Sequence, residues 1–194
     1  MRRAGFGART VAGVEWKWMH RLCEDGIPCA RPVALGEELR GGQELRSVLV
    51  TEAVAGESLE RWTARWNELE KHKTREVLQG VARLVSRFHQ KGYIHRDLYL
   101  SHIFYDSDAV GEESLRLIDL QRVLRPRWRK ERWIVKDLAS LSFSAPRHCF
   151  SRTDRLRWLR DYLGAGKLDA AGKRLAYRVI GKTMSIARRE LSRE

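Results

Sequence analysis

The stretch His95-Arg96-Asp97-Leu98-Tyr99-Leu100-Ser101-His102-Ile103-Phe104, followed by Leu117-Ile118-Asp119-Leu120, decides the architecture of this chain. It places two carboxylates, Asp97 and Asp119, in two loops 22 positions apart, and short apolar runs border each loop. That layout is typical of a phosphotransferase site, in which one Asp faces the acceptor hydroxyl and the other holds a divalent metal. The alternative interpretation is that both residues only cap turns.

The segments around the two loops are predicted from their apolar periodicity. A long helix over 73–91 precedes the first loop and ends at Gly92. Short strands are predicted at 93–94, 103–105 and 115–118, and helices from 134 to the end. The apolar stripe of the long helix consists of Val77, Leu78, Val81, Leu84, Val85 and Phe88.

Upstream of the long helix, the sequence predicts a helix and a small β-hairpin. The helix covers 14–24 and ends at Asp25-Gly26, where glycine supplies a left-handed cap. Strands at 32–37 and 46–52 form a hairpin around Gly41-Gly42. Ser58 is the expected N-cap of the next helix. With no further strand beside it, this hairpin would have an unpaired edge and an uncovered face.

These elements predict an α+β fold with two parts. Residues 1–52 would form a partial N-terminal lobe, and residues 53–194 a mostly helical C-terminal lobe like that of a kinase. A hairpin that projects two acidic loops from a helical body is the feature that favours this class. No sequence repeat is present, and no pattern sets an oligomeric state.

Composition limits the partners and the compartment. The 194 residues contain 38 Lys and Arg against 25 Asp and Glu, a net charge of +13 that favours an anionic partner. No nucleic-acid motif is present, so nucleic acid is not expected. Three Cys are too few for a disulfide framework and fit a reducing compartment. Without a signal-like or membrane-spanning run, we expect a cytoplasmic protein that touches the anionic inner membrane from inside.

Phosphoryl transfer needs positioning and charge neutralisation more than covalent chemistry. Asp97 would orient the acceptor hydroxyl and accept its proton. His95 and Arg96 would hold the catalytic loop, His95 by packing and hydrogen bonding and Arg96 by pairing with an acid or phosphate. Asp119 would bind the Mg²⁺ that bridges the nucleotide phosphates.

The sequence also resembles a known family. The segments at 92–104, 117–122 and 136–141, together with 153–162 and Glu15-Trp16 near the start, are similar to the lipopolysaccharide kinase family. The resemblance implies a protein-kinase-like fold, ATP and Mg²⁺ as cofactors, and a sugar hydroxyl of the lipopolysaccharide inner core, on heptose or Kdo, as acceptor.

Residue by residue, the resemblance implies roles for further positions. Asp97 would be the catalytic Asp and Asp119 the metal Asp. Asp137 would support the catalytic loop from a helix, and Glu15 would pair with the phosphate-binding Lys. Glu52, Ala53 and Val54 would form the interlobe hinge, whose backbone meets the adenine.

Two departures from protein kinases leave alternatives open. His102 stands where protein kinases place a metal-binding Asn, so metal ligation and simple packing both remain. Glu15 has no upstream Lys strand, and Gly5-Phe6-Gly7 is a poor substitute for a Gly-rich loop. Either the true start lies upstream or the protein is a degenerate kinase. The alternatives in function are a non-catalytic, pseudokinase-like binding module and a kinase acting on another small molecule or protein.

Residue type and spacing also predict the character of a basic loop, a basic helix and four tryptophans. The basic loop 122–132, with Trp128 and Trp133, would meet lipid or substrate phosphates or would simply be solvated. The basic helix at 174–193 is expected to be solvated. Core positions are predicted for four tryptophans, Trp16, Trp62, Trp66 and Trp158.

Overall fold

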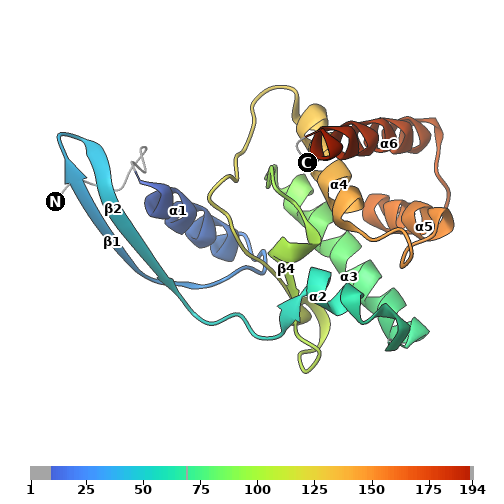
Figure 1. Cartoon of the computed structure of the whole chain (residues 1–194), viewed down its shortest axis with the longest axis horizontal. Coiled ribbons are helices and arrows are strands. Elements are labelled where there is room, and N and C mark those ends of the chain that lie inside the picture. The colour runs from blue at the N-terminus through green and yellow to red at the C-terminus, as the bar shows by residue number, and fades with distance from the viewer. Residues whose placement is uncertain (1–9, 69, 193–194) are drawn as a thin grey trace.

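The computed structural model describes residues 10–68 and 70–192. The Gly5-Phe6-Gly7 segment lies outside the described residues. A small N-terminal unit of one helix and a β-hairpin lies beside a larger helical body (Figure 1). Within the described ranges, no helix has the length and apolar character needed to cross a bilayer.

Helix α1 (Val11–Glu24) ends where its sequence predicts and begins three residues before the predicted start at Val14. The side chain of Thr10 caps its first turn by accepting the backbone N–H of Gly13. At the other end, the Gly26 N–H bonds to the Cys23 carbonyl and the Ile27 N–H to the Leu22 carbonyl. This is a Schellman motif, and Gly26 has the positive φ of 68° that it requires.

The predicted hairpin forms, with longer strands than expected. Strands β1 (Pro32–Arg40) and β2 (Gln43–Thr51) pair antiparallel around Gly41 and Gly42, whose φ values are 56° and 87°. Two consecutive positive φ values define a type I′ turn, which glycine adopts without strain. Helix α1 covers one face of this two-stranded sheet.

The other face of the hairpin is exposed, as predicted. Val48 and Val50 alternate with the half-buried Leu49 along β2 and expose 60% and 46% of their surface. Along the described residues, neither strand has a second neighbour, because the sheet contains β1 and β2 only. The hairpin therefore presents apolar side chains and free backbone edges to solvent.

A second small sheet carries the two loops of interest. Strands β3 (Glu57–Ser58), β4 (Ile103–Tyr105) and β5 (Leu115–Leu117) lie antiparallel in the order β3-β4-β5. Short 3₁₀ helices flank β4, at Leu100–His102 (η2) and Gly111–Ser114 (η3). The expected strand at 93–94 is reduced to one isolated bridge between Ile94 and Leu124. That prediction was wrong in extent, because Tyr93 is a buried packing residue and forms no ladder.

Helices form the rest of the body. They are α2 (Leu59–Ala64), η1 (Trp66–Glu68), α3 (Lys71–Gln90), α4 (Lys130–Ser144), α5 (Arg152–Leu163) and α6 (Ala170–Leu191). Helix α3 packs against α5, and α4 packs against α6 (Figure 1). The Ser58 hydroxyl caps α2, as predicted, by accepting the Arg61 N–H.

The core joins the two loops to the helical body. The predicted stripe of α3 is largely buried, with Phe88 fully enclosed and Val81 and Val85 nearly so. Leu98 and Leu120, each beside one of the loop aspartates, have no exposed surface. Burial of these two leucines therefore anchors both acidic loops to the hydrophobic core.

Candidate active site

Asp137 fixes the backbone of the first acidic loop, the predicted catalytic loop. Its carboxylate is fully buried and accepts the backbone N–H of His95 at 2.7 Å and that of Arg96 at 2.8 Å. Two N–H bonds to one carboxylate define the course of the chain immediately before Asp97. The support of this loop by a helical Asp, which the resemblance implied, is thus present in the structure.

A buried relay holds Asp137 in turn. Nε2 of His89 lies 3.3 Å from the Asp137 carboxylate, and Nδ1 lies 2.9 Å from the Tyr162 hydroxyl. Because an ionised carboxylate only accepts, Nε2 carries the proton and Nδ1 accepts from Tyr162. Burial raises the pKa of Tyr162, which keeps it a donor. Three helices, α3, α4 and α5, therefore meet under the loop.

Asp97 lies at the surface end of this loop and is paired with a cation. Its side chain is 17% exposed, and Nη1 of Arg122 lies 2.9 Å from Oδ1 and 2.7 Å from Oδ2. Arg96, immediately before it, has a φ of 74°, a left-handed value that is rare for a residue with a Cβ. Such strain persists where surrounding contacts enforce it, here the Asp137 bond to the Arg96 N–H.

Lys136 is a second cation at this loop. Its ammonium group donates to the Arg96 carbonyl at 2.6 Å. Burial lowers the pKa of Lys136, and the negative charge of Asp97 partly opposes that change. The Arg96 carbonyl and the Asp97 carboxylate are thus each held by a basic side chain, Lys136 and Arg122 respectively.

His102 lies between the two acidic loops. Nδ1 lies 2.7 Å from the Asp97 carbonyl, so Nδ1 carries the proton in the neutral ring and donates it. Nε2 then presents a lone pair to Asp119, whose Oδ2 is 3.4 Å away. Two acceptors facing each other can share a bridging cation or a water that donates to both. Asp119 has a left-handed φ of 56°, a second strained position at this site.

This arrangement fits a divalent metal held jointly with a phosphate ligand. Among the described residues, no group of three or more His, Cys, Asp and Glu side chains surrounds a metal position. The imidazole and the carboxylate therefore supply two donors, and nucleotide oxygens and water would supply the others. Imidazole is more usual for transition metals than for Mg²⁺, which prefers oxygen.

Glu15 contacts the second loop and not a lysine. Its Oε1 accepts the backbone N–H of Leu120 at 2.9 Å, which ties α1 to the residue after Asp119. Burial raises the pKa of Glu15, the Leu120 bond opposes this, and Asp119 adds to the rise. In the described part of the chain no lysine pairs with Glu15, so its expected phosphate-gripping partner is not among these residues.

His95 and Arg96 pack differently from each other. His95 is fully buried, and Nε2 lies 3.1 Å from the Ile118 carbonyl, which joins the two acidic loops. Burial lowers the pKa of His95, which favours the neutral ring. The Arg96 guanidinium lies over the Trp133 ring at 5.6 Å instead of pairing with an acid. Trp133 therefore supports the loop, whereas Trp128 is 82% exposed.

The remaining predicted positions lie away from this cluster. Glu52, Ala53 and Val54 follow β2 in the irregular segment that connects the hairpin to β3, where an interlobe hinge would lie (Figure 1). The Glu52 N–H donates to the Arg31 carbonyl. Their adenine-binding role stays a prediction, as do the catalytic roles of the loop residues.

Sequence reasoning missed Arg122, Lys136 and Tyr162 as parts of the site. Arg122 could not be distinguished by sequence from the other arginines of the basic loop 122–132. Tyr162 and His89 are 73 positions apart, and no local period relates them.

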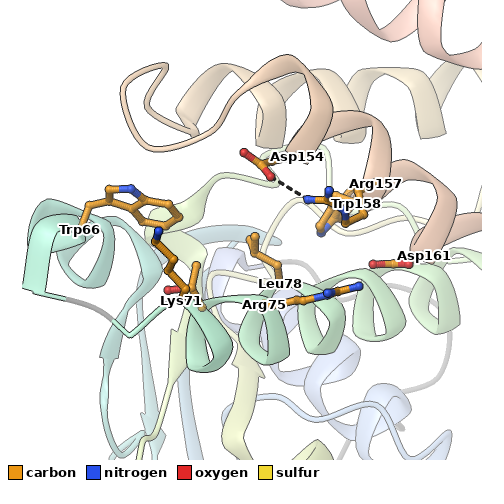
Figure 2. A pocket seen from close by; sticks show the side chains of 9 residues that line it. Trp66, Lys71, Arg75, Leu78, Asp154, Arg157, Trp158 and Asp161 are labelled. Carbon is orange, nitrogen blue, oxygen red and sulfur yellow. Dashed lines mark hydrogen bonds and ion pairs between the residues drawn. The ribbon is translucent and has the colours of Figure 1, made fainter.

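A separate cavity of about 570 Å³ opens between α3, η1 and α5 (Figure 2). Neither Asp97 nor Asp119 lines it. Trp66 and Trp158, predicted as core residues, are half-buried at its wall, whereas Trp62 is buried as predicted. Figure 2 shows Arg157 paired with Asp154 beside this opening. Its lining residues are Trp66, Lys71, Thr74, Arg75, Leu78, Asp154, Arg157, Trp158 and Asp161.

Fold and site together define a protein of the kinase-like class. Two acidic loops project from a small sheet onto a helical body, and a buried Asp on α4 supports the first loop. The solved structure of WaaP in complex with acyl carrier protein matches with a TM-score of 0.72 and 33% identity, covering 90% of this chain and 76% of that one. The expectation of an α+β, protein-kinase-like fold is thereby confirmed.

The chain belongs to the lipopolysaccharide kinase (Kdo/WaaP) family, whose model matches residues 2–162. It is 36% identical over 154 residues to lipopolysaccharide core heptose(I) kinase WaaP of Pseudomonas aeruginosa, covering 76% of this chain and 58% of that protein. Over 139 residues it is 30% identical to 3-deoxy-D-manno-octulosonic acid kinase of Xylella fastidiosa, covering 70% and 51%. The chain thus spans little more than half the length of these relatives.

Proposed function

We propose that the chain is an ATP-dependent phosphotransferase acting on a sugar hydroxyl of the lipopolysaccharide inner core, on heptose or Kdo. The observation that carries the proposal is the position of His102, which donates to the Asp97 carbonyl and faces Asp119. One side chain thereby links the acceptor-facing loop to the metal-facing loop. Family membership supports the same reaction class.

In this proposal, Asp97 orients the acceptor hydroxyl and accepts its proton as the oxygen attacks the γ-phosphorus. The bond to the bridging oxygen breaks and ADP leaves. Arg122 pairs with the Asp97 carboxylate. From that position its positive charge would also stabilise the negative charge of the phosphoryl group being transferred. The divalent metal, Mg²⁺ by expectation, neutralises phosphate charge when bound by Asp119 and His102.

The division of labour between the two parts is part of the proposal. Residues 1–52 would act as a partial N-terminal lobe, in which Glu15 positions the metal loop and Glu52, Ala53 and Val54 meet the adenine. Residues 53–194 would act as the catalytic lobe. The protein would work at the cytoplasmic face of the inner membrane, with the net charge of +13 favouring an anionic surface.

Transfer of labelled phosphate from ATP to purified core lipopolysaccharide tests this function. We expect incorporation by the wild type and a loss of at least about 10³-fold in Asp97→Asn. Asp161→Asn, which removes a carboxylate from the separate cavity, is the matched control and should keep full activity. Full activity in Asp97→Asn would refute the assigned role.

A pseudokinase-like binding module is the second candidate, favoured by the absence of a lysine beside Glu15 in the described residues. It predicts no transfer to any acceptor and no clear stabilisation by ATP with divalent metal. Thermal denaturation with ATP, with and without divalent metal, distinguishes this module from an active kinase when it is combined with the transfer assay. Acceptor competition would reveal a kinase acting on another small molecule or protein.

A protein partner is proposed by extension from the solved relative, which is WaaP in complex with acyl carrier protein. We expect this chain to bind an acyl carrier protein as well. Size-exclusion co-elution at low and high salt measures it, and two separate peaks at both salt concentrations would reject the partner.

A further inference from the structure

Two of the three cysteines lie side by side at the end of α1. The Sγ atoms of Cys23 and Cys29 are 3.7 Å apart. They meet because the Schellman motif at Gly26 reverses the chain directly after α1, so that the segment after Ile27 runs back along the helix. A disulfide has an S–S length of about 2.0 Å, so the thiols must approach by less than about 2 Å.

The two thiols differ in access, which sets an order of reaction. Cys23 is exposed, whereas Cys29 is 2% exposed and its Sγ lies 3.8 Å from the Met19 carbonyl. Burial, then the neighbouring Cys23, raises the pKa of Cys29, so the buried sulfur stays a thiol in the reduced protein. The exposed Cys23 therefore meets an oxidant first.

The pair is joined to the candidate active site at both ends. Cys29 forms a β-bridge with Leu117, and the Ala30 N–H bonds to the Leu117 carbonyl at 3.1 Å. Leu117 ends the strand that leads into Asp119. Cys23 belongs to α1, whose Glu15 accepts the Leu120 N–H. A covalent link between the cysteines would thus fasten α1 to the backbone on the other side of the metal loop.

We propose that Cys23 and Cys29 form a reversible disulfide that locks α1 against the strand leading into Asp119. The oxidant is a low-molecular-weight disulfide such as oxidised glutathione. The Cys23 thiolate attacks one of its sulfurs, forming a mixed disulfide and releasing one glutathione thiol. The Cys29 thiol then gives up its proton as its sulfur attacks Cys23 and forms the internal bond, and the second glutathione leaves as a thiolate that takes up this proton. The protein loses two hydrogens, and the oxidant is reduced to two thiols.

Cys149 provides an internal reference. It is buried, its Sγ lies 3.6 Å from the Thr63 carbonyl, and it has no thiol neighbour in the described chain. A disulfide between Cys149 and either of the other two is not expected. The proposal therefore predicts which one of the three thiols survives oxidation.

Thiol titration of the full chain in denaturant, after equilibration with oxidised glutathione, tests the proposal. We expect free thiols to fall from three to one, with a mass lower by two hydrogens and no adduct, and dithiothreitol to restore all three. Peptide mapping should join Cys23 to Cys29. Three persisting thiols, or a glutathione adduct that remains on Cys23, would overturn it.

Single substitutions assign the steps. Cys29→Ser should accumulate the mixed disulfide on Cys23, Cys23→Ser should lose no thiol, and Cys149→Ser should still close the internal bond. Amide exchange of Leu120 should slow several-fold on oxidation, because α1 is held in place. Unchanged exchange would refute the lock while leaving the disulfide. None of these readouts needs phosphotransfer, so an inactive chain would not affect them.

Discussion

The Arg122 side chain reaches both carboxylate oxygens of Asp97, at 2.9 Å and 2.7 Å, from a position 25 residues further along the chain. Arg122 is half exposed and Asp97 is mostly covered, so Arg122 lies on the solvent side of the Asp97 carboxylate. In the proposed mechanism, the carboxylate that accepts the proton is thereby oriented by a cation that can also meet an incoming phosphate.

Replacing Arg122 by Gln should lower phosphotransfer by about 10²-fold with little change in stability. The carboxylate loses its orienting partner, but an exposed ion pair contributes about 0–1 kcal/mol to folding. Initial rates and thermal denaturation measure the two effects. Arg127→Gln removes the same charge from the same exposed loop and should change neither. Equal losses in both variants would mean that only the basic surface matters.

Removing the Asp137 carboxylate should damage folding as well as activity. Asp137→Ala leaves the N–H groups of His95 and Arg96 without an acceptor, and His89 loses its partner. We expect a loss of about 3 kcal/mol in the free energy of unfolding, measured by urea denaturation. Tyr162→Phe removes only the outer bond of the relay and should cost about 1 kcal/mol. A neutral Asp137→Ala would contradict the supporting role.

Changing His102 should alter the choice of metal. His102→Asn replaces an imidazole nitrogen by an amide oxygen, which suits Mg²⁺ better than transition metals. We expect the nucleotide-dependent rise in melting temperature with Mg²⁺ to grow relative to that with Ni²⁺, which imidazole suits. Tyr99→Phe, on the same loop, is the control. An unchanged ratio between the two metals would favour simple packing for His102.

The start of α5 should show a pH-dependent contribution to stability. Ser151 and Asp154 form a capping box, and the Ser151 hydroxyl bond lowers the pKa of Asp154 from its ordinary 3.8. A depressed carboxyl pKa stabilises the fold above pH 3.8, and the effect disappears as pH falls through the folded value. Ser151→Ala should therefore cost about 1 kcal/mol at pH 6 and less at pH 2.5. Thermal unfolding followed by circular dichroism measures both, with Thr153→Ala as the control.

The bare face of the hairpin should drive self-association. Val48→Lys and Val50→Lys place charges on the exposed face of β2 and should reduce light scattering at high protein concentration without loss of stability. Leu49→Lys, one position away, points to the half-buried side and should destabilise the fold. If scattering is the same in the wild type and all three variants, the hairpin is not the associating surface.

Local signals in the sequence were sufficient for most elements. Gly26 and the Gly41-Gly42 pair were recognised because only glycine takes a left-handed backbone without strain, and all three have positive φ. The apolar stripe of α3 was recognised because a helix with one buried face must repeat its apolar residues at helical spacing. The prediction of a strand at 93–94 was wrong in extent because two apolar residues fit a strand and a buried loop equally well.

The same reasoning identified only some of the residues at the candidate site. Asp97 and Asp119 were singled out because they stand in short loops beside apolar runs, and His102 because it stands where protein kinases place a metal-binding Asn. The contact of Tyr162 with His89 and of Arg122 with Asp97 joins residues with no periodic relation. Such partners depend on how helices and loops pack, and the pattern of neighbouring residues in the sequence carries no information about that packing.

The sequence by itself determined the two acidic loops, the helix and hairpin before them, and membership of the kinase-like class, because turn chemistry and apolar periodicity act over neighbouring residues. Only the tertiary structure decided which cation faces Asp97, that Glu15 bonds to Leu120, and that Cys23 meets Cys29. Those contacts follow from the packing of α1 and the basic loop against the second acidic loop, where burial and backbone hydrogen bonding select the partners.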